Sequence, residues 1–260
     1  MLAVISPAKT LDFTSEIKVA KATEPAFLAD ATTLAALMAT KKPAQLRALM
    51  AISESLAELN HARFQAWSTA TPAANLRPAL LAFKGDVYLG LDAASLGRRE
   101  LAYAQTHVRI LSGLYGLLRP FDLIAPYRLE MGTTLKNPRG RNLYDYWGAA
   151  PAQALAAQAK SLRTTTLVNL ASQEYFRAVD EQALGLNVVT PVFKDWSGGD
   201  YKVLSFFAKR ARGMMVRYIV EQRPRAPADL RTFNRGGYAY DAASSTATAP
   251  VFLRRSTAET

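Results

Sequence analysis

The segment AKRARGMMVRYIVEQRPR, residues 208–225, combines a dense positive charge with a pattern of apolar residues. Six of its residues are Lys or Arg, and Glu221 is its only acid. At about 100° per residue, Met214, Met215, Tyr218 and Ile219 gather on one side. The spacing predicts a helix over 208–223 whose apolar side faces the core.

The other side of this predicted helix mixes cations with short apolar residues. With Lys209 placed at zero, Val216 and Val220 fall at about 340° and 20°, among the basic residues. Such a mixture is typical of the wall of a cleft, and we expect the cations to converge there on phosphate groups. The alternative is that long basic stems cover apolar surface while their charged ends stay in water. The expected nucleic-acid contacts on this helix are Lys209, Arg210, Arg212 and Arg217.

Strands and helices interleave along the rest of the chain. We expect strands at 2–6, 79–83, 164–172, 187–193, 201–207, 237–240 and 251–254. We expect helices at 27–40, 44–67, 98–112 and 150–161, an irregular loop at 120–148, and a turn at WSGGD, 196–200. This order predicts a mixed α/β (α+β) fold, with a mixed sheet surrounded by helices in a single compact domain over 1–260.

Composition narrows the classes of function. The chain has 260 residues, a net charge of +11, no cysteine and two histidines, so disulfides, thiolate metal sites and a cysteine nucleophile are excluded. We expect no bound metal and no cofactor. Without a signal peptide or a long apolar segment, we expect a cytoplasmic protein with no membrane association. The excess of positive charge favours a polyanionic partner, nucleic acid first.

A second candidate element is LSGLYGLLRP, residues 111–120. Its two glycines follow a predicted helix and suggest a helix-hairpin-helix-like element near 98–120, whose free backbone N–H groups would bind phosphate without reading sequence. The alternative is a helix cap at Gly113 and a second turn at Gly116. The expected contacts here are Arg109, Gly113, Leu114, Gly116 and Arg119.

Polar residues after strands and in stiff loops leave an enzymatic alternative open. Such an enzyme would act on a phosphorylated or damaged nucleobase or nucleotide in the same cleft. No known catalytic signature is present. Each residue also has a structural interpretation as a cap, a turn former or an ion-pair partner, and a basic scaffold for an acidic protein is a third alternative. The candidate catalytic residues are Lys9, Asp86, Arg128, Glu130, Asn169, Ser172 and Glu174.

Several long motifs resemble the peroxide-stress YaaA family. They are SPAKTLDF (6–13), LAFKGDVYLGL (81–91), LSGLYGLLRPFDLIAPYRLEMG (111–132), LYDYWG (143–148), NLASQEYF (169–176), PVF (191–193) and SFFAKRARGMMVRYI (205–219). The resemblance implies a cytoplasmic protein of the response to hydroperoxide that limits damage from unincorporated iron. It also implies DNA binding through a positively charged cleft and a helix-hairpin-helix element, which on this chain would centre on residues 113–116. With no cysteine and two histidines, we expect any effect on iron to be indirect.

Overall fold

The computed structural model describes residues 1–16, 22–68 and 75–255, and these residues form a mixed α/β fold with four sheets. The largest sheet has the strand order β6-β5-β1-β8-β9. Its middle strand β1 is the apolar run Leu2–Ile5, and all four of its residues are buried. β1 runs parallel to β5 on one side and to β8 on the other, with Ala3 opposite Val108 and Val4 opposite Asn169. The predicted α/β class is therefore confirmed.

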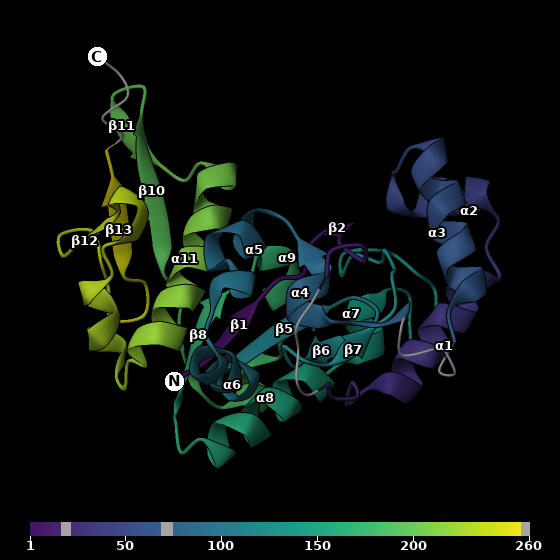
Figure 1. Ribbon diagram of the computed structural model, residues 1–260, viewed down its shortest axis with the longest axis horizontal. Coiled ribbons are helices and arrows are strands. Elements are labelled where there is room, and N and C mark those ends of the chain that lie inside the picture. Colours follow the sequence, from purple (N-terminus) through teal and green to yellow (C-terminus); the bar gives the residue numbers. More distant parts are fainter. Residues whose placement is uncertain (17–21, 69–74, 256–260) are drawn as a thin grey trace.

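β6 and β9 form the two edges of this sheet, and the strands between them are apolar. β9 is parallel to β8, and β6 is antiparallel to β5 (Figure 1). Strands that are covered on both faces need apolar side chains on both, as the sequences around residues 108 and 167 provide. The bounds are β5 Val108–Ser112, β6 Gly116–Leu118, β8 Thr166–Leu170 and β9 Asn187–Val189.

A second sheet has the order β11-β10-β13-β12. Its hairpin β10–β11 turns at Gly198 and Gly199, both of which have positive φ, so the predicted turn at 196–200 is confirmed. The predicted strand 187–193 is divided between the two sheets, because β9 ends at residue 189 and β10 begins at residue 192. The bounds are β10 Val192–Ser197, β11 Asp200–Lys202, β12 Ala239–Asp241 and β13 Val251–Arg254.

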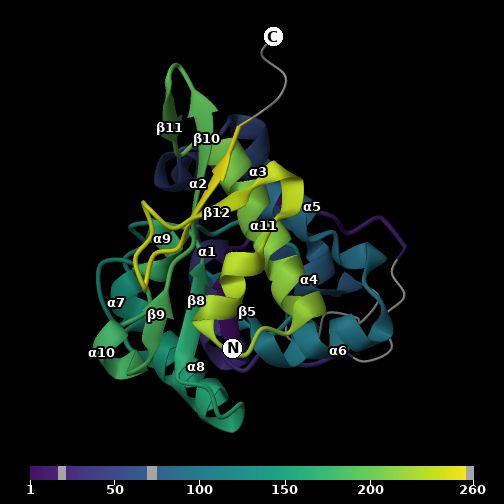
Figure 2. The ribbon, with the colours of Figure 1, turned by 90° about the vertical axis from the view of Figure 1, so that its left-hand side faces the viewer.

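The helix of the opening segment, α11 Ser205–Gln222, contacts both β8 of the first sheet and β10 of the second (Figure 2). Helices α5 Asp86–Leu91 and α6 Arg98–His107 also pack against it. Val216 and Val220, expected on a cleft wall, are fully buried. The prediction was wrong there because α11 is covered on several sides, whereas the helical period assumes one buried face.

The other helices are α1 Leu28–Ala39, α2 Pro43–Met50, α3 Glu54–Ala66, α4 Ala79–Ala82, α7 Leu143–Trp147, α8 Ala150–Ser161, α9 Gln173–Phe176 and α10 Glu181–Leu184. Two short strand pairs, β2 Thr10–Leu11 with β4 Phe83–Lys84 and β3 Arg77–Pro78 with β7 Leu123–Ile124, complete the sheets. Short 3-10 helices lie at Ala93–Ser95, Pro227–Thr232 and Arg235–Gly237. The segment 79–83, predicted as a strand, is thus mostly helix α4.

The helix predicted over 44–67 is two helices. Ala51 adopts the left-handed conformation at the end of α2, and Ser53 caps the start of α3 by accepting a hydrogen bond from the backbone of Leu56. The helical spacing of apolar residues continues across this break, so the spacing alone does not reveal where α2 ends and α3 begins. Leu56 and Leu59 on α3 are 36% and 45% exposed.

The predicted helix-hairpin-helix element at 98–120 is also wrong. Helix α6 ends at residue 107, and residues 108–118 form the antiparallel pair β5 and β6. Gly113 lies in the turn between these strands, Gly116 is the first residue of β6, and both are buried. Gly113 faces the backbone of Leu129, and Gly116, at φ +67°, faces the ring of Trp147. Their role is close packing, so their backbone is not available to phosphate.

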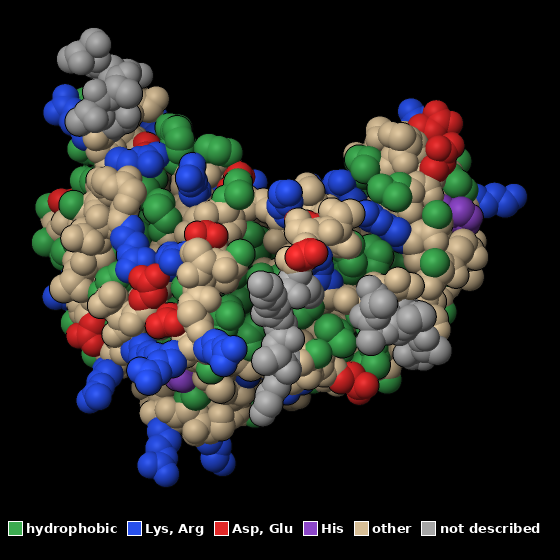
Figure 3. Space-filling view, viewed as in Figure 1, with side chains coloured by type: hydrophobic (Ala, Val, Ile, Leu, Met, Phe, Trp, Pro, Cys, Tyr) green, Lys and Arg blue, Asp and Glu red, His purple; other side chains and the backbone are tan. Residues whose placement is uncertain are grey.

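The space-filling view shows a broad notch on one edge of the molecule (Figure 3). In the ribbon, the β10–β11 hairpin stands on one side of this notch, helices α2 and α3 stand on the other, and β2 lies between them (Figure 1). Among the described residues, none of the helices is both long and apolar enough to span a bilayer.

Candidate functional site

A pocket of about 400 Å³ lies at the carboxyl ends of the central strands. Ser6, Ala8 and Lys9 follow β1 and line one part of it, while Ser172 and Glu174 follow β8 and line another. After β1 the chain first forms β5 on one side of β1 and later forms β8 on the other side. The direction in which strands are added to the sheet therefore reverses at β1. In open α/β sheets, ligands bind in the crevice formed at such a point.

The two strand ends are joined by hydrogen bonds. The backbone N–H of Ser172 donates to Ser6 Oγ at 2.9 Å, and Ser172 Oγ accepts from the backbone N–H of Tyr175 at 3.4 Å as the cap of α9. Tyr88 Oη donates to the carbonyl oxygen of Ser6 at 3.0 Å. These contacts hold the loops after β1 and β8 at a fixed separation, as a binding pocket requires.

Glu130 is already neutralised by two cations. Its carboxylate lies 2.7 Å from Lys9 Nζ and 2.9 Å from Arg128 Nη2. Arg128 is the less exposed of the two cations, at 15% against 64% for Lys9. Glu174 accepts a hydrogen bond from the backbone N–H of Gly132 at 2.9 Å, which ties α9 to the loop that carries Glu130.

Three charged groups of the pocket have no such partner. The side chains of Asp86, Lys209 and Arg212 form no hydrogen bond or ion pair with any other residue that the structure describes. Arg212 is half-buried and also lines a neighbouring pocket. Its burial lowers the pKa of its guanidinium group. A half-buried cation without a carboxylate is costly unless an anion joins it, so Arg212 is a candidate contact for an anionic ligand.

The inner lining of the pocket is aromatic. Tyr88, Tyr127 and Tyr175 are 7%, 4% and 9% exposed. Burial raises the pKa of all three phenols, and the charges of neighbouring tyrosines add to this for Tyr88 and Tyr175, so the rings stay neutral. Tyr127 Oη and Ser112 Oγ are 2.6 Å apart and share a hydrogen bond. The pocket therefore has an apolar, ring-lined interior and a charged entrance.

The structure brings together six of the seven candidate catalytic residues, because all but Asn169 line this pocket. Asn169 is buried within β8, where Oδ1 accepts from the backbone of Ala171 and Nδ2 donates to Thr190, and it faces the neighbouring pocket. Of the predicted basic residues on α11, Lys209 and Arg212 line the pocket, and Arg210 is exposed outside it.

The nucleic-acid contacts predicted around residue 113 lie outside this pocket. Arg109 is 5% exposed, and Nη1 donates to the carbonyl oxygens of Gln105 and Val108 at the end of α6. Burial lowers the pKa of Arg109 to about 10. Leu114 is fully buried, and Arg119 pairs with Asp122 at 2.9 Å. Arg109 and Leu114 therefore present almost no surface to a nucleic acid, and Arg119 is held in an ion pair.

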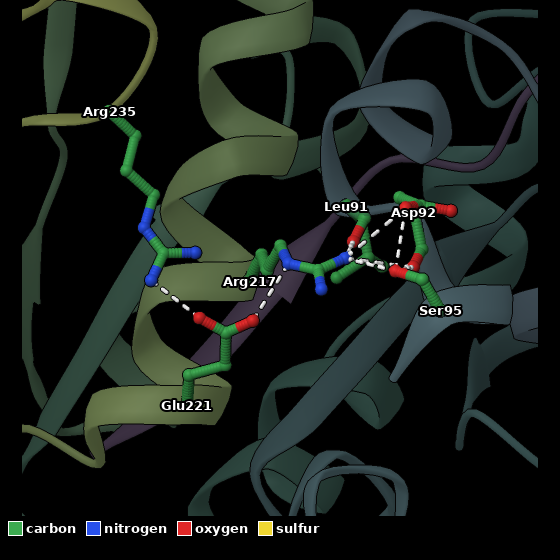
Figure 4. Close-up of polar contacts among 6 residues, drawn as sticks. All are labelled: Leu91, Asp92, Ser95, Arg217, Glu221 and Arg235. Atoms are coloured by element: carbon green, nitrogen blue, oxygen red, sulfur yellow. Dashed lines mark hydrogen bonds and ion pairs between the residues drawn. The ribbon is translucent and has the colours of Figure 1, made fainter. Parts of the chain in front are cut away.

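Arg217 also departs from the prediction. Its Nη1 donates to the carbonyl oxygen of Asp92 at 3.0 Å and to Ser95 Oγ at 2.7 Å. Its Nε donates to Glu221, which also binds Arg235 (Figure 4). Carbonyl groups at a helix end lack intrahelical partners, and Arg217 satisfies those at the end of α5. Arg217 is therefore already paired and is not free to bind an anion.

Sequence reasoning missed the aromatic lining and Ser6. Each of these tyrosines stands close to a candidate polar residue in the chain: Tyr88 follows Asp86, Tyr127 precedes Arg128, and Tyr175 follows Glu174. That proximity was the available signal. A tyrosine beside a polar loop residue also suits an ordinary core, and so it points to no site until the segments are seen together.

Comparison with known proteins agrees with the motifs. The model of the family described as "Peroxide stress protein YaaA" matches residues 1–244. The chain belongs to the peroxide stress protein YaaA family. A UPF0246 protein of Paraburkholderia xenovorans is 52% identical, covering 98% of this chain and 99% of that protein. UPF0246 proteins of Idiomarina loihiensis and Aliivibrio fischeri are 51% and 50% identical, each covering 98% of both chains.

Proposed function

We propose that this member of the YaaA family binds DNA in the notch, mainly through the phosphate backbone, as part of the response to hydroperoxide. Membership of the peroxide stress protein YaaA family supports the link to peroxide stress. The excess of positive charge, +11 over the chain, supports a polyanionic partner.

The observation that carries the proposal is a set of unpaired cations at the start of α11. Lys209, Arg210 and Arg212 have no acidic partner among the described residues, whereas Arg217 on the same helix is neutralised. Side chains held in ion pairs contribute little to binding a polyanion. Free cations on a concave surface release counterions from DNA, which favours binding without reading sequence.

The proposed effect on iron follows indirectly. Among the described residues, no group of three or more His, Asp or Glu side chains is placed to hold a metal ion. We propose that the protein limits the damage caused by unincorporated iron by covering DNA, the target of the radicals, and that it does not sequester the metal.

Charge reversal near the start of α11 tests the DNA proposal. Lys209→Glu with Arg212→Glu is expected to abolish binding to a 20-base-pair duplex and to leave the folded structure intact. Arg98→Glu with Arg99→Glu makes the same change in charge at the exposed start of α6, on an edge away from the notch, and is the control. Wild-type affinity should fall linearly with log salt concentration. Equal affinity of the two double variants would contradict the proposal.

An enzyme in the same pocket is a second candidate function. The observation that favours it is the convergence of Lys9, Asp86, Glu130 and Glu174 at a sheet edge where catalytic groups commonly lie. Such an enzyme would act on a phosphorylated or damaged nucleotide. Glu174→Gln is expected to remove turnover in a screen of nucleotides and damaged oligonucleotides without changing DNA affinity. Absence of turnover by the wild-type protein would count against this candidate.

A further inference from the structure

The pocket has three unpaired charged groups, the cations Lys209 and Arg212 and the carboxylate of Asp86, and a ligand that carries complementary groups would satisfy all of them. We propose that it binds one nucleotide, with the phosphate at Arg212 and Lys209, the base among the tyrosines, and an amino group of the base at Asp86. This inference deepens the proposed function. It rests on that function when the bound nucleotide is part of a DNA strand held in the notch.

The phosphate end of the proposed site is at the start of α11. Lys209 is exposed and Arg212 is half-buried, so together they reach from the surface into the pocket. Arg212 offers a planar set of N–H donors suited to phosphate oxygens, and no acid among the described residues competes for it. By contrast, Arg128 is paired with Glu130 and is not free to bind a second anion.

The base end is set by Asp86 and the rings. Asp86 is half-buried at the first turn of α5, and its carboxylate accepts hydrogen bonds only. Adenine, cytosine and guanine carry an exocyclic amino group that can donate to such an acceptor, whereas thymine does not. The neutral rings of Tyr88, Tyr127 and Tyr175 offer apolar surface to a base, as aromatic residues do in proteins that bind unpaired nucleic acid.

Volume limits the ligand to one nucleotide unit. The pocket measures about 400 Å³, within the range of small-molecule sites and too small for a duplex. A base must therefore leave its stack to enter. The cost of extrusion is lowest where the base is already unpaired, so bound DNA should be selected for unpaired, amino-bearing bases.

The test compares duplex DNA with DNA that has one unpaired adenine opposite an abasic site. The ratio of the two dissociation constants is expected to be about tenfold for the wild-type protein, the size of one good polar contact. Asp86→Asn and Arg212→Gln should each bring the ratio close to one. Arg210→Gln removes the same charge from the same helix outside the pocket; it should weaken both complexes alike and keep the ratio.

A second measurement distinguishes a free nucleotide from a nucleotide within DNA as the ligand of the pocket. Free 2′-deoxyadenosine 5′-monophosphate, titrated into the protein by calorimetry, should bind to the wild-type protein and not to Arg212→Gln if free nucleotides are ligands. Binding only to the unpaired base in DNA would assign the site to DNA. Equal affinity for both DNA forms, together with no binding of the mononucleotide, would overturn the inference, while duplex binding alone would leave the proposed function standing.

Discussion

Gly213 of α11 packs directly against the carbonyl oxygen of Val87 in α5, with no room for a Cβ atom between them. Gly90 makes the reciprocal contact with the carbonyl oxygen of Arg210. The two helices therefore cross at backbone contact. Because Asp86 opens α5 and Arg212 immediately precedes Gly213, this crossing brings Asp86 and Arg212, two of the three unpaired charged groups, into the lining of one pocket.

Replacing Gly213 by Ala is expected to lower stability. Alanine is the better helix former, by about 1 kcal/mol, but its methyl group would overlap the Val87 carbonyl group and force the helices apart. We expect a net loss of about 2 kcal/mol in the free energy of unfolding, measured by urea denaturation. Gly132→Ala is the control, since its Cβ would meet only the movable side chain of Glu174, at 3.1 Å. A Gly213→Ala protein as stable as the wild type would contradict the tight crossing.

Replacing Ala51 by Gly is expected to raise stability. Ala51 ends α2 with φ 50° and ψ 52°, a conformation that glycine adopts without the steric cost paid by other residues. The expected gain is about 1 kcal/mol in urea denaturation. Ala48→Gly, at an exposed position inside the same helix, should cost about 1 kcal/mol. The same effect at both positions would mean that the break at residue 51 is absent in solution.

Glu221 should make stability depend on pH. Burial favours its protonated form, but Arg235 and Arg217, at 2.5 and 2.8 Å, outweigh burial and hold the pKa of Glu221 below its usual 4.5. The unfolded chain therefore takes up this proton at a higher pH than the folded protein does. The stabilisation is present above about pH 4.5 and is lost as pH falls through the lower, folded-state pKa.

The corresponding experiment compares wild type and Glu221→Gln in urea at pH 7 and pH 3.5. At pH 7 we expect the variant to be less stable by about 1 kcal/mol. At pH 3.5 the difference should shrink, because Glu221 of the unfolded wild-type chain is then mostly protonated, below its usual pKa of 4.5. The comparison between proteins cancels the other carboxylates that titrate in this range. A difference independent of pH would assign the effect to packing and not to the ion pairs.

Asp195 is a buried charge that depends on Arg254. It is 5% exposed, lies 2.5 Å from Arg254 Nε and accepts a hydrogen bond from Tyr238 Oη at 2.8 Å. Arg254→Leu leaves the carboxylate buried without its cation and should cost about 3 kcal/mol in urea denaturation at pH 7.

Two further variants separate charge from packing at this site. Arg254 also stacks on Phe207 and Tyr238, so part of the loss reflects those ring contacts. Adding Asp195→Asn to Arg254→Leu removes the unpaired charge and should recover part of the stability. Arg255→Leu, at an exposed neighbouring cation, should cost less than about 1 kcal/mol. If the double variant were no more stable than Arg254→Leu, the buried charge would not be the cause.

The amino-acid sequence by itself determined the elements whose pattern is local. The apolar run at 2–5, the strand around 166–170, the glycine turn at 198–199 and the helix over 208–223 were all predicted, because strand and helix periods and turn chemistry act over a few residues. The helix begins earlier than predicted, at Ser205, within the segment 201–207 that was expected to be a strand. The loops that carry Lys9, Asp86, Glu130 and Glu174 were also recognised as a possible site from their polar residues alone.

Only the tertiary structure decided which of these residues work together. The segment 108–112 is compatible with a helix in isolation and becomes a strand because β1 and β6 pair with it on both sides. Arg212 and Arg217 lie five residues apart on one helix, yet Arg217 binds the end of α5 and Glu221, while Arg212 lines the pocket and has no acidic partner among the described residues. A charge acquires its role from the groups that surround it, and here those groups come from segments far away in the chain.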